Sequence, residues 1–182
     1  MTTHRTRRST ALLALALATA GCASAPEPRP ECGDPEPIAL TIEATPRLNP
    51  DAEGRALPTE LRVYQLRDAG ALDTASFEDV WQSAETVLGE SLVSTESLTI
   101  YPGERLERAL RPARDTAAIV AVVIVRQPAG RTWRAVVPMT HPETGGELCP
   151  AIEPGRIRLR LDDYRVEAIT PRRTPSDTET RG

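Results

Sequence analysis

The stretch Thr-Ala-Ala-Ile-Val-Ala-Val-Val-Ile-Val, residues 116–125, is an almost unbroken apolar run that is rich in β-branched side chains. Charged residues bound it, with Arg114 and Asp115 before it and Arg126 after it. A run of this length is too short to cross a membrane as a helix. Its composition is typical of a strand that is covered on both faces. The sequence therefore predicts a central strand in a layered β structure.

Shorter segments on either side of this run alternate apolar and polar residues with a period of two, which predicts half-buried strands. Turn formers such as Pro102-Gly103 and residues 127–130 separate them. Seven or so short strands with one inserted helix predict a mostly β fold, a two-sheet β-sandwich within residues 37–170. The expected strands lie at residues 37–44, 60–66, 98–100, 106–110, 133–137, 157–161 and 164–169.

A short helix is predicted directly after Ser76. Ser76 and Asp79 form a capping box, in which each side chain bonds the backbone N–H of the other residue. Apolar residues then recur at helical spacing until Gly89, a residue type that commonly ends helices. We expect the two aromatic rings on this face to pack into the core, and ligand binding by them is the alternative. The apolar positions are Phe77, Val80, Trp81, Ala84 and Leu88, of which Phe77 and Trp81 carry the rings.

A row of arginines marks the last clear strand. Strict alternation with apolar residues places their three guanidinium groups on one solvent face. The simpler interpretation is a solvated strand face that resists aggregation. A surface for an acidic partner is the alternative. The row consists of Arg156, Arg158 and Arg160, alternating with Ile157, Leu159 and Leu161.

The size of the chain indicates one domain, and its charge argues against a nucleic-acid-binding protein. The 182 residues are enough for one domain with appended segments. The net charge is −4, the sequence pI is about 5.3, and every basic residue apart from histidine is an arginine. Removal of residues 1–21 would also remove Arg5, Arg7 and Arg8, which leaves −4 − 3 = −7. An acidic chain of this kind argues against a nucleic-acid partner.

Residues 1–21 have the organisation of a secretory signal peptide. Basic residues at positions 5–8 precede an apolar run at positions 11–20. The run ends in Thr-Ala-Gly-Cys, residues 19–22, which resembles the lipobox that directs acylation of Cys22, although Thr19 stands where Leu is commoner. An ordinary signal peptide with a chance cysteine is the alternative, and twin-arginine export through Arg7 and Arg8 is a weaker one. Lipidation would hold the protein on a membrane surface.

The residues that follow the signal peptide predict which membrane holds the protein and how far the domain stands from that membrane. Ala23, rather than Asp, follows the cysteine, and by the usual bacterial sorting rule this favours the outer membrane, with the domain on the periplasmic face. Residues 22–36 are rich in proline, which predicts an extended tether, roughly 40 Å long at about 3.1 Å per residue. Residues 171–182 are expected to be a disordered tail.

Two cysteines remain once Cys22 carries the lipid. In an exported, oxidising compartment a disulfide between Cys32 and Cys149 is the simplest interpretation. Two free thiols are the alternative. We expect no metal site, because the mature chain has a single histidine, His141, and no suitably spaced third soft ligand.

The sequence offers no recognisable catalytic centre. His141 is the only mature candidate for a base, and no Gly-x-Ser-x-Gly elbow accompanies it. Asp162 and Asp163 are adjacent, which on a strand would send them to opposite faces. No glycine-rich phosphate loop is present. We therefore expect a binding module with no enzymatic activity, no cofactor and no small-molecule substrate; a lipidated transthyretin-like carrier or hydrolase is the alternative.

A long loop precedes the second expected strand. Residues 49–58, Asn-Pro-Asp-Ala-Glu-Gly-Arg-Ala-Leu-Pro, are built from turn formers and should be exposed. The chain then enters the alternating strand that ends in Val-Tyr-Gln-Leu, residues 63–66. Ordered loops on rigid sandwiches often carry function. An ordinary mobile surface loop is the alternative.

This loop and strand, N-P-D-x-x-G-R-x-x-P followed by V-Y-Q-L, resemble the TssJ family, the outer-membrane lipoproteins of type VI secretion systems. Four further motifs follow in that family's order, and the resemblance covers about residues 36–140. They are Leu88-Gly89, Tyr101-Pro102-Gly103-Glu104, the run from Ala117 to Val125, and Trp133-Arg134.

The resemblance implies a transthyretin-like sandwich with a small helical appendage. It also implies a partner, the periplasmic carboxy-terminal region of the inner-membrane protein TssM, contacted by the loop between the first two strands. In this chain the expected contact residues are Asn49, Pro50, Asp51, Glu53, Gly54, Arg55 and Pro58. A general outer-membrane assembly lipoprotein with the same anchor and fold is the remaining alternative.

Overall fold

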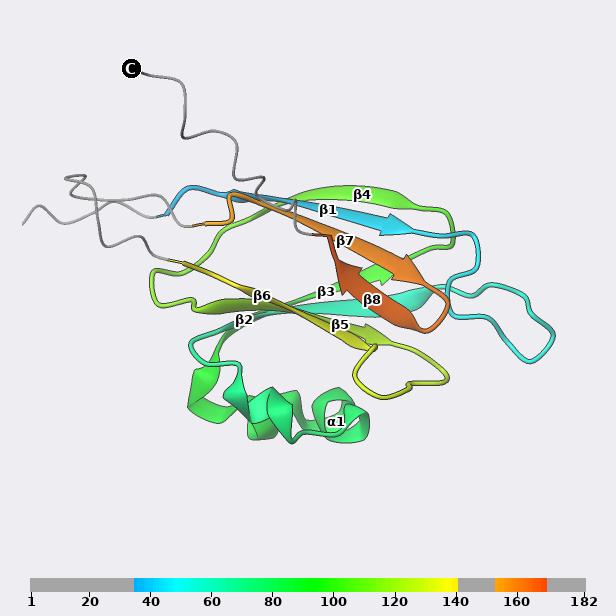
Figure 1. The fold of residues 1–182 in the computed structure, drawn as a ribbon, viewed down its shortest axis with the longest axis horizontal. Helices are drawn as coiled ribbons and strands as arrows, with labels where there is room; N and C mark the ends of the chain where they lie inside the picture. Colours follow the sequence, from blue (N-terminus) through cyan, green and yellow to red (C-terminus); the bar gives the residue numbers. More distant parts are fainter. Residues whose placement is uncertain (1–34, 141–152, 170–182) are drawn as a thin grey trace, which may run out of the picture. The chain divides into compact units, whose positions relative to one another are not determined.

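The computed structural model describes residues 35–140 and 153–169, which all lie in the unit Glu31–Gly182 (Figure 1). Within these residues the chain forms β-strands, one α-helix and two short 3-10 helices. In chain order they are β1 (Ile38–Ala44), β2 (Thr59–Leu66), η1 (Gly70–Asp73), α1 (Phe77–Leu88), η2 (Gly89–Ser91), β3 (Leu92–Ile100), β4 (Arg105–Leu110), β5 (Ala118–Ile124), β6 (Arg134–Pro138), β7 (Arg156–Asp162) and β8 (Arg165–Ala168).

The strands form two four-stranded sheets, which we call sheet A, in the order β4-β1-β7-β8, and sheet B, in the order β3-β2-β5-β6. Neighbours pair antiparallel except β1 and β7, which run parallel with Leu40 opposite Ile157. The predicted mostly β, two-sheet sandwich with one inserted helix is confirmed. The parallel pair closes sheet A between segments more than 100 residues apart, so this sheet cannot form from local hairpins alone.

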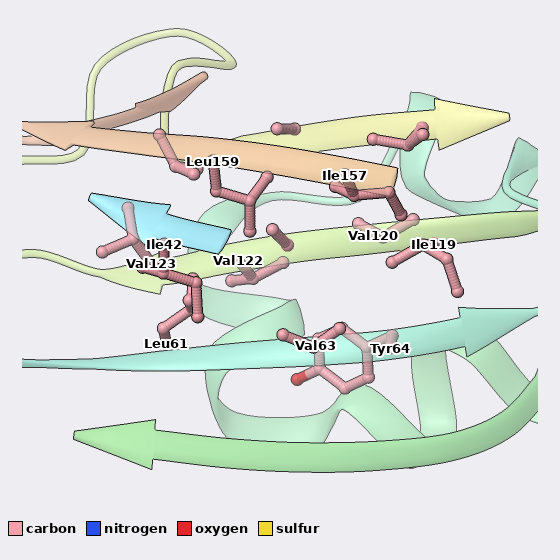
Figure 2. Close-up of a cluster of buried hydrophobic side chains, with 14 of the residues drawn as sticks. Ile42, Leu61, Val63, Tyr64, Ile119, Val120, Val122, Val123, Ile157 and Leu159 are labelled. Carbon is pink, nitrogen blue, oxygen red and sulfur yellow. The ribbon is translucent and has the colours of Figure 1, made fainter. Parts of the chain in front are cut away.

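The core lies between the sheets, where alternate residues of each strand meet (Figure 2). In β1 and β7 every second residue is buried, and the residues between them face outward. Burial of each Leu, Ile or Val side chain contributes about 1.5–3 kcal/mol. The central residues include Ile42, Leu61, Val63, Val122 and Leu159, all of which are essentially inaccessible to solvent.

Strand β5 is the predicted central strand, and this prediction is confirmed. It lies between β2 and β6, and six of its seven residues are buried. The side chains of β5 point to both faces of sheet B, so another element must pack against each face. One face meets sheet A, and helix α1 lies on the opposite side of sheet B (Figure 1).

Helix α1 begins and ends as predicted. The Ser76 Oγ accepts a hydrogen bond from the Asp79 N–H at 3.1 Å, and the Asp79 carboxylate accepts one from the Ser76 N–H at 3.3 Å. Gly89 ends the helix at φ 51°, a left-handed conformation that glycine adopts without steric cost. Ser83 departs from helical geometry, with φ −141° and ψ 41°, and introduces a kink.

The prediction that Trp81 packs into the core is wrong, because its side chain is 45% exposed. Val80 and Leu88 are the buried helix residues, so Trp81, one position on, lies at the border of the apolar face. Phe77 is half-buried and contacts Trp81, with ring centroids 6.1 Å apart, and Trp133, at 5.5 Å. The buried indole belongs to Trp133.

Strand β3 begins at Leu92, well before the predicted start at Leu98. It is an edge strand of sheet B, and most of its side chains are exposed or half-buried. Because most positions of this strand are partly open to solvent, the apolar alternation that marks a half-buried strand in a sequence is weak. Its extent depends on pairing with β2, which continues from Thr59–Ile100 to Leu66–Leu92.

Several predictions fall outside the described residues: the signal peptide, the tether, the tail, Cys22, the pair Cys32 and Cys149, and His141. Among the described residues, the one helix is too short and polar to span a membrane. The same residues contain no cluster of three metal-ligating side chains.

Candidate functional site

The candidate site is the loop that joins β1 to β2, residues 45–58, which we call the β1–β2 loop. It leaves the sandwich at the end where β1 finishes (Figure 1). Two other connections lie beside it. The Asn49 N–H bonds the Asp163 carbonyl in the β7–β8 turn at 2.7 Å, and the Arg126 N–H, just after β5, bonds the Asn49 side chain at 2.9 Å.

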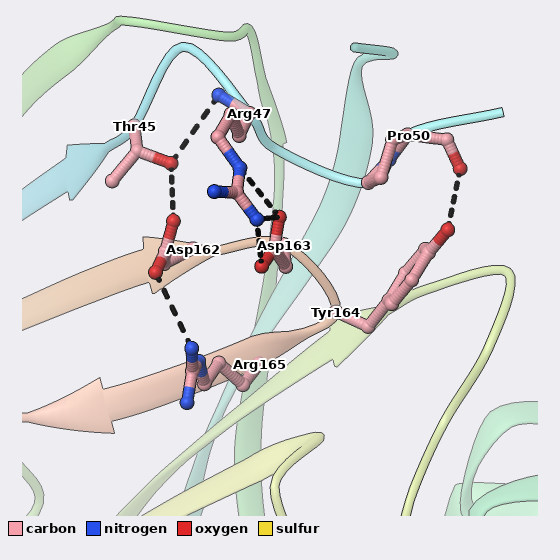
Figure 3. Close-up of polar contacts among 7 residues, drawn as sticks. All are labelled: Thr45, Arg47, Pro50, Asp162, Asp163, Tyr164 and Arg165. Atoms are coloured by element: carbon pink, nitrogen blue, oxygen red, sulfur yellow. Dashed lines mark hydrogen bonds and ion pairs between the residues drawn. The ribbon is translucent and has the colours of Figure 1, made fainter. Parts of the chain in front are cut away.

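The β7–β8 turn holds the first half of the loop (Figure 3). The Thr45 hydroxyl donates to the Asp162 carboxylate at 2.7 Å. The Arg47 guanidinium bonds both carboxylate oxygens of Asp163, at 2.9 and 2.7 Å through Nη2, and this partner raises the pKa of Arg47. The Tyr164 hydroxyl donates to the Pro50 carbonyl at 2.8 Å. Three consecutive residues of the turn therefore fix the path of the loop.

Asn49 is buried, with 5% of its surface exposed, so its predicted place in an exposed loop is wrong. Its backbone is left-handed, at φ 45°, which asparagine tolerates better than most residues. Its side-chain oxygen accepts the Arg126 N–H. Asn49 thus joins the loop to the end of β5.

Asp51 stabilises the second half of the loop through hydrogen bonds to other loop residues. Its carboxylate accepts hydrogen bonds from the Arg55 N–H at 2.8 Å, the Glu53 N–H at 3.0 Å and the Arg55 Nε at 2.8 Å. Gly54, at φ 80°, completes the turn and donates its N–H to the Asp51 carbonyl. Only 10% of the Asp51 side chain is exposed, because these groups surround it.

The bonds around Asp51 predict how the loop responds to acid. The backbone N–H and guanidinium of Arg55, with the N–H of Glu53, lower the Asp51 pKa below its ordinary value of 3.8. The carboxylate therefore stabilises the loop fully above that ordinary value, and the stabilisation is lost as the pH falls through the lower, folded-state pKa. In NMR titrations we expect the Arg55 amide signal, which reports its bond to Asp51, to stay constant from neutral pH to about pH 4 and to move only below it. A transition above pH 4 that Asp51→Asn abolishes would contradict this.

The tip of the loop carries one acid and one base that face solvent. The Arg55 side chain is 76% exposed and the Glu53 side chain 68% exposed, and their charged groups are 3.4 Å apart. Four of the seven expected contact residues are thus exposed, namely Glu53, Gly54, Arg55 and Pro58. Asn49 is buried, and Pro50 and Asp51 are half-buried and bonded within the protein. The loop presents a small polar tip on a fixed base.

Sequence reasoning missed the residues that hold this base. In the sequence, Asp162 and Asp163 stand out only as a possible catalytic pair, and Tyr164 only as part of a strand. Their partners in the loop lie 114–117 residues away in the chain. No pattern among neighbouring residues in the sequence indicates a contact between segments so far apart. The adjacent acids could at most have indicated a turn, because aspartate favours turns and Asp163 adopts a left-handed backbone, at φ 50°.

A family model described as "Type VI secretion lipoprotein, VasD, EvfM, TssJ, VC_A0113" matches residues 36–163. Among solved structures, the T6SS lipoprotein TssJ1 from Pseudomonas aeruginosa is 27% identical, with a TM-score of 0.58 over 75% of this chain and 98% of that one. Serratia marcescens Lip, described as a membrane-bound component of the Type VI Secretion System, is 21% identical, with a TM-score of 0.61 over 75% and 99%.

A third similar chain belongs to a structure described as the T6SS protein TssM C-terminal domain (869-1107) from EAEC. It is 15% identical, with a TM-score of 0.59 over 75% of this chain and 99% of that one. At such identities the last two likenesses concern the fold alone. Comparison with curated proteins found no match.

Proposed function

Because the chain belongs to the type VI secretion lipoprotein family that includes TssJ, we propose that it is a structural lipoprotein of a type VI secretion membrane complex. In this proposal a lipid on Cys22 anchors it at the periplasmic face of the outer membrane. Its β1–β2 loop binds the periplasmic carboxy-terminal region of TssM. The protein would thus connect the two membranes.

The observation that carries the binding proposal is the fixed base of the β1–β2 loop. A loop whose polar tip is held in one conformation loses little conformational entropy when it binds. Glu53 and Arg55 can then offer a carboxylate and a guanidinium in set positions. The description of one similar structure, which names a TssM C-terminal domain, adds support for the identity of the partner.

The direction of the chain supports the anchoring proposal. Cys22 lies 15 residues before Pro37, which precedes the start of β1, whereas the β1–β2 loop lies at the end of that strand. The anchored segment would therefore join the start of β1, and the β1–β2 loop follows its end. This arrangement leaves the loop tip free to face a partner across the periplasm. We retain the Cys32–Cys149 disulfide as part of the proposal for that oxidising compartment.

The test is a pull-down of the unacylated mature chain, residues 22–182 with Cys22→Ser, by the periplasmic carboxy-terminal region of TssM from the same genome. The test variant is Glu53→Ala/Arg55→Ala, which removes the exposed charges and leaves Asp51 its backbone bonds. The matched control is Arg67→Ala/Asp115→Ala. This second exposed ion pair lies at the opposite end of sheet B.

We expect the loop variant to bind at least about tenfold more weakly, equivalent to ~1.4 kcal/mol, and the control to bind as the wild type does. Equal binding by all three proteins would place the contact elsewhere on the domain. A folded wild-type chain that TssM does not retain would refute the proposed partnership itself.

A further inference from the structure

The outer face of sheet A is rich in unpaired arginines. The predicted alternation in β7 is confirmed, since Arg156, Arg158 and Arg160 are exposed and the residues between them are buried or nearly so. Within the described residues none of these three side chains forms an ion pair or hydrogen bond. Their guanidinium groups are therefore available to a ligand.

Part of this face is an open groove of about 560 Å³, which we call the arginine groove. Its floor is low because two small residues, Ala39 in β1 and Ala109 in β4, lie opposite each other. Arg156 in β7 lies opposite Ala39 on the other side. Four arginines and one acid line it, and the acid, Glu107, bonds Arg105 at 3.1 Å. The four are Arg105, Arg108, Arg156 and Arg158. The lining thus carries a net charge of +4 − 1 = +3, which Glu43, paired with Arg105 from beside the groove, reduces to +2.

The arginine groove starts where β1 begins and runs along that strand. Pro37 and Ile38 contribute to its lining. Pro37 is separated from Cys22 by a short stretch of chain, residues 23–36. One end of the groove is therefore at the end of β1 that the proposed lipid anchor joins, and Arg105, opposite Glu43, marks its other end.

Acidic residues concentrate on the other side of the molecule. Residues 68–104 contain no arginine, lysine or histidine. They form α1 with the short helices η1 and η2, on the side of sheet B that faces away from sheet A (Figure 1), and β3, an edge strand of sheet B. The acids of this segment are Asp68, Asp73, Glu78, Asp79, Glu85, Glu90, Glu96 and Glu104. The two regions thus differ in charge, although arginines also lie elsewhere on the domain, such as Arg62 and Arg131, which bond α1 and η1.

We propose that the arginine groove binds the phosphate groups of anionic phospholipids in the membrane to which the protein is anchored. Guanidinium groups bond phosphate oxygens through two parallel N–H donors, and arginines near an anionic membrane surface add to the effect of a lipid anchor. Bound headgroups would hold the end of sheet A where β1 begins at the membrane, so the β1–β2 loop stays directed away from it. The cellular setting rests on the proposed lipidation of Cys22, whereas the binding itself does not.

An acidic peptide fits the arginine groove less well. The floor is the face of a sheet between β4, β1 and β7, whose backbone groups already bond one another. A peptide there would gain none of the main-chain hydrogen bonds that an added edge strand gains. A headgroup needs only charge and hydrogen-bond donors, and the groove supplies both.

The test is co-sedimentation of the unacylated mature chain, residues 22–182 with Cys22→Ser, with vesicles of phosphatidylethanolamine that contain or lack phosphatidylglycerol. The test variant is Arg156→Gln/Arg158→Gln. The control, Arg126→Gln/Arg131→Gln, removes the same charge from exposed arginines outside the groove. A poly-glutamate peptide is the second probe, and thermal unfolding verifies that every variant is folded. Neither TssM nor the lipid anchor takes part, so failure here is distinct from failure of the proposed function.

We expect the wild type and the control to bind the phosphatidylglycerol vesicles, and the test variant to bind roughly 20–30-fold more weakly, about fivefold for each arginine. Binding should weaken as salt is raised. Equal binding to both kinds of vesicle, or equal loss in both variants, would overturn the proposal. Binding to poly-glutamate through Arg156 and Arg158 without vesicle binding would instead assign the groove to an acidic protein segment.

Discussion

Replacing Leu159 by alanine is expected to lower the free energy of unfolding by about 2–5 kcal/mol. Leu159 is 1% exposed and lies in β7, an interior strand of sheet A, opposite Ile42 in β1. Its side chain points into the space between the sheets (Figure 2). Truncation leaves a cavity there, because strands on both sides hold the surrounding side chains in place.

The neighbouring residue provides the control. Arg158 faces solvent on the same strand, so Arg158→Ala should change the free energy of unfolding by no more than about 0.5 kcal/mol. Leu159→Met, which preserves volume, should cost less than about 1.5 kcal/mol. Urea denaturation of the three variants measures these differences. Similar losses for Leu159→Ala and Arg158→Ala would mean that the alternation of β7 is not the one described.

Replacing Asn49 by alanine is expected to destabilise the β1–β2 loop strongly. The Arg126 N–H would lose its acceptor, which costs about 1–3 kcal/mol when the group is kept from water. The left-handed backbone at position 49 would cost roughly a further 1–2 kcal/mol with an alanine side chain. Denaturation measures the sum, and the Arg126 amide signal reports the lost bond.

Two further substitutions separate these effects. Asn49→Gly removes the backbone strain but not the missing acceptor, so it should recover roughly 1 kcal/mol of the loss. Asn49→Asp keeps an oxygen in reach of the Arg126 N–H and should retain that bond. If glycine and alanine were equally destabilising, the left-handed conformation would not contribute. If aspartate were no better than alanine, the hydrogen bond to Arg126 would not be the cause.

Loss of this bond should also affect the proposed contact with TssM. Asn49 lies between the start of the loop, held by the β7–β8 turn, and the tip organised by Asp51. A variant that frees the loop pays the entropy of ordering it on binding. The Asn49 substitutions therefore act on binding by loosening the loop. Glu53→Ala/Arg55→Ala removes the exposed charges, together with one of the three bonds to the Asp51 carboxylate.

Local features of the fold could be predicted because each is encoded in neighbouring residues. The alternation of Ile157, Leu159 and Leu161 with arginines determines which face of β7 is buried. The capping box of Ser76 and Asp79 and the glycine at position 89 determine where α1 begins and ends. The apolar run that contains β5 requires cover on both faces. Motifs in order along the chain also indicated the family.

Other features depend on residues that are distant in the chain, and only the tertiary structure determined them. The parallel pairing of β1 with β7 and the hold of Asp162, Asp163 and Tyr164 on the β1–β2 loop join segments more than 100 residues apart. The border position of Trp81 depends on which side of α1 meets sheet B. Local sequence sets the conformation each segment prefers, but a contact between two segments exists only once the whole sandwich has brought them together.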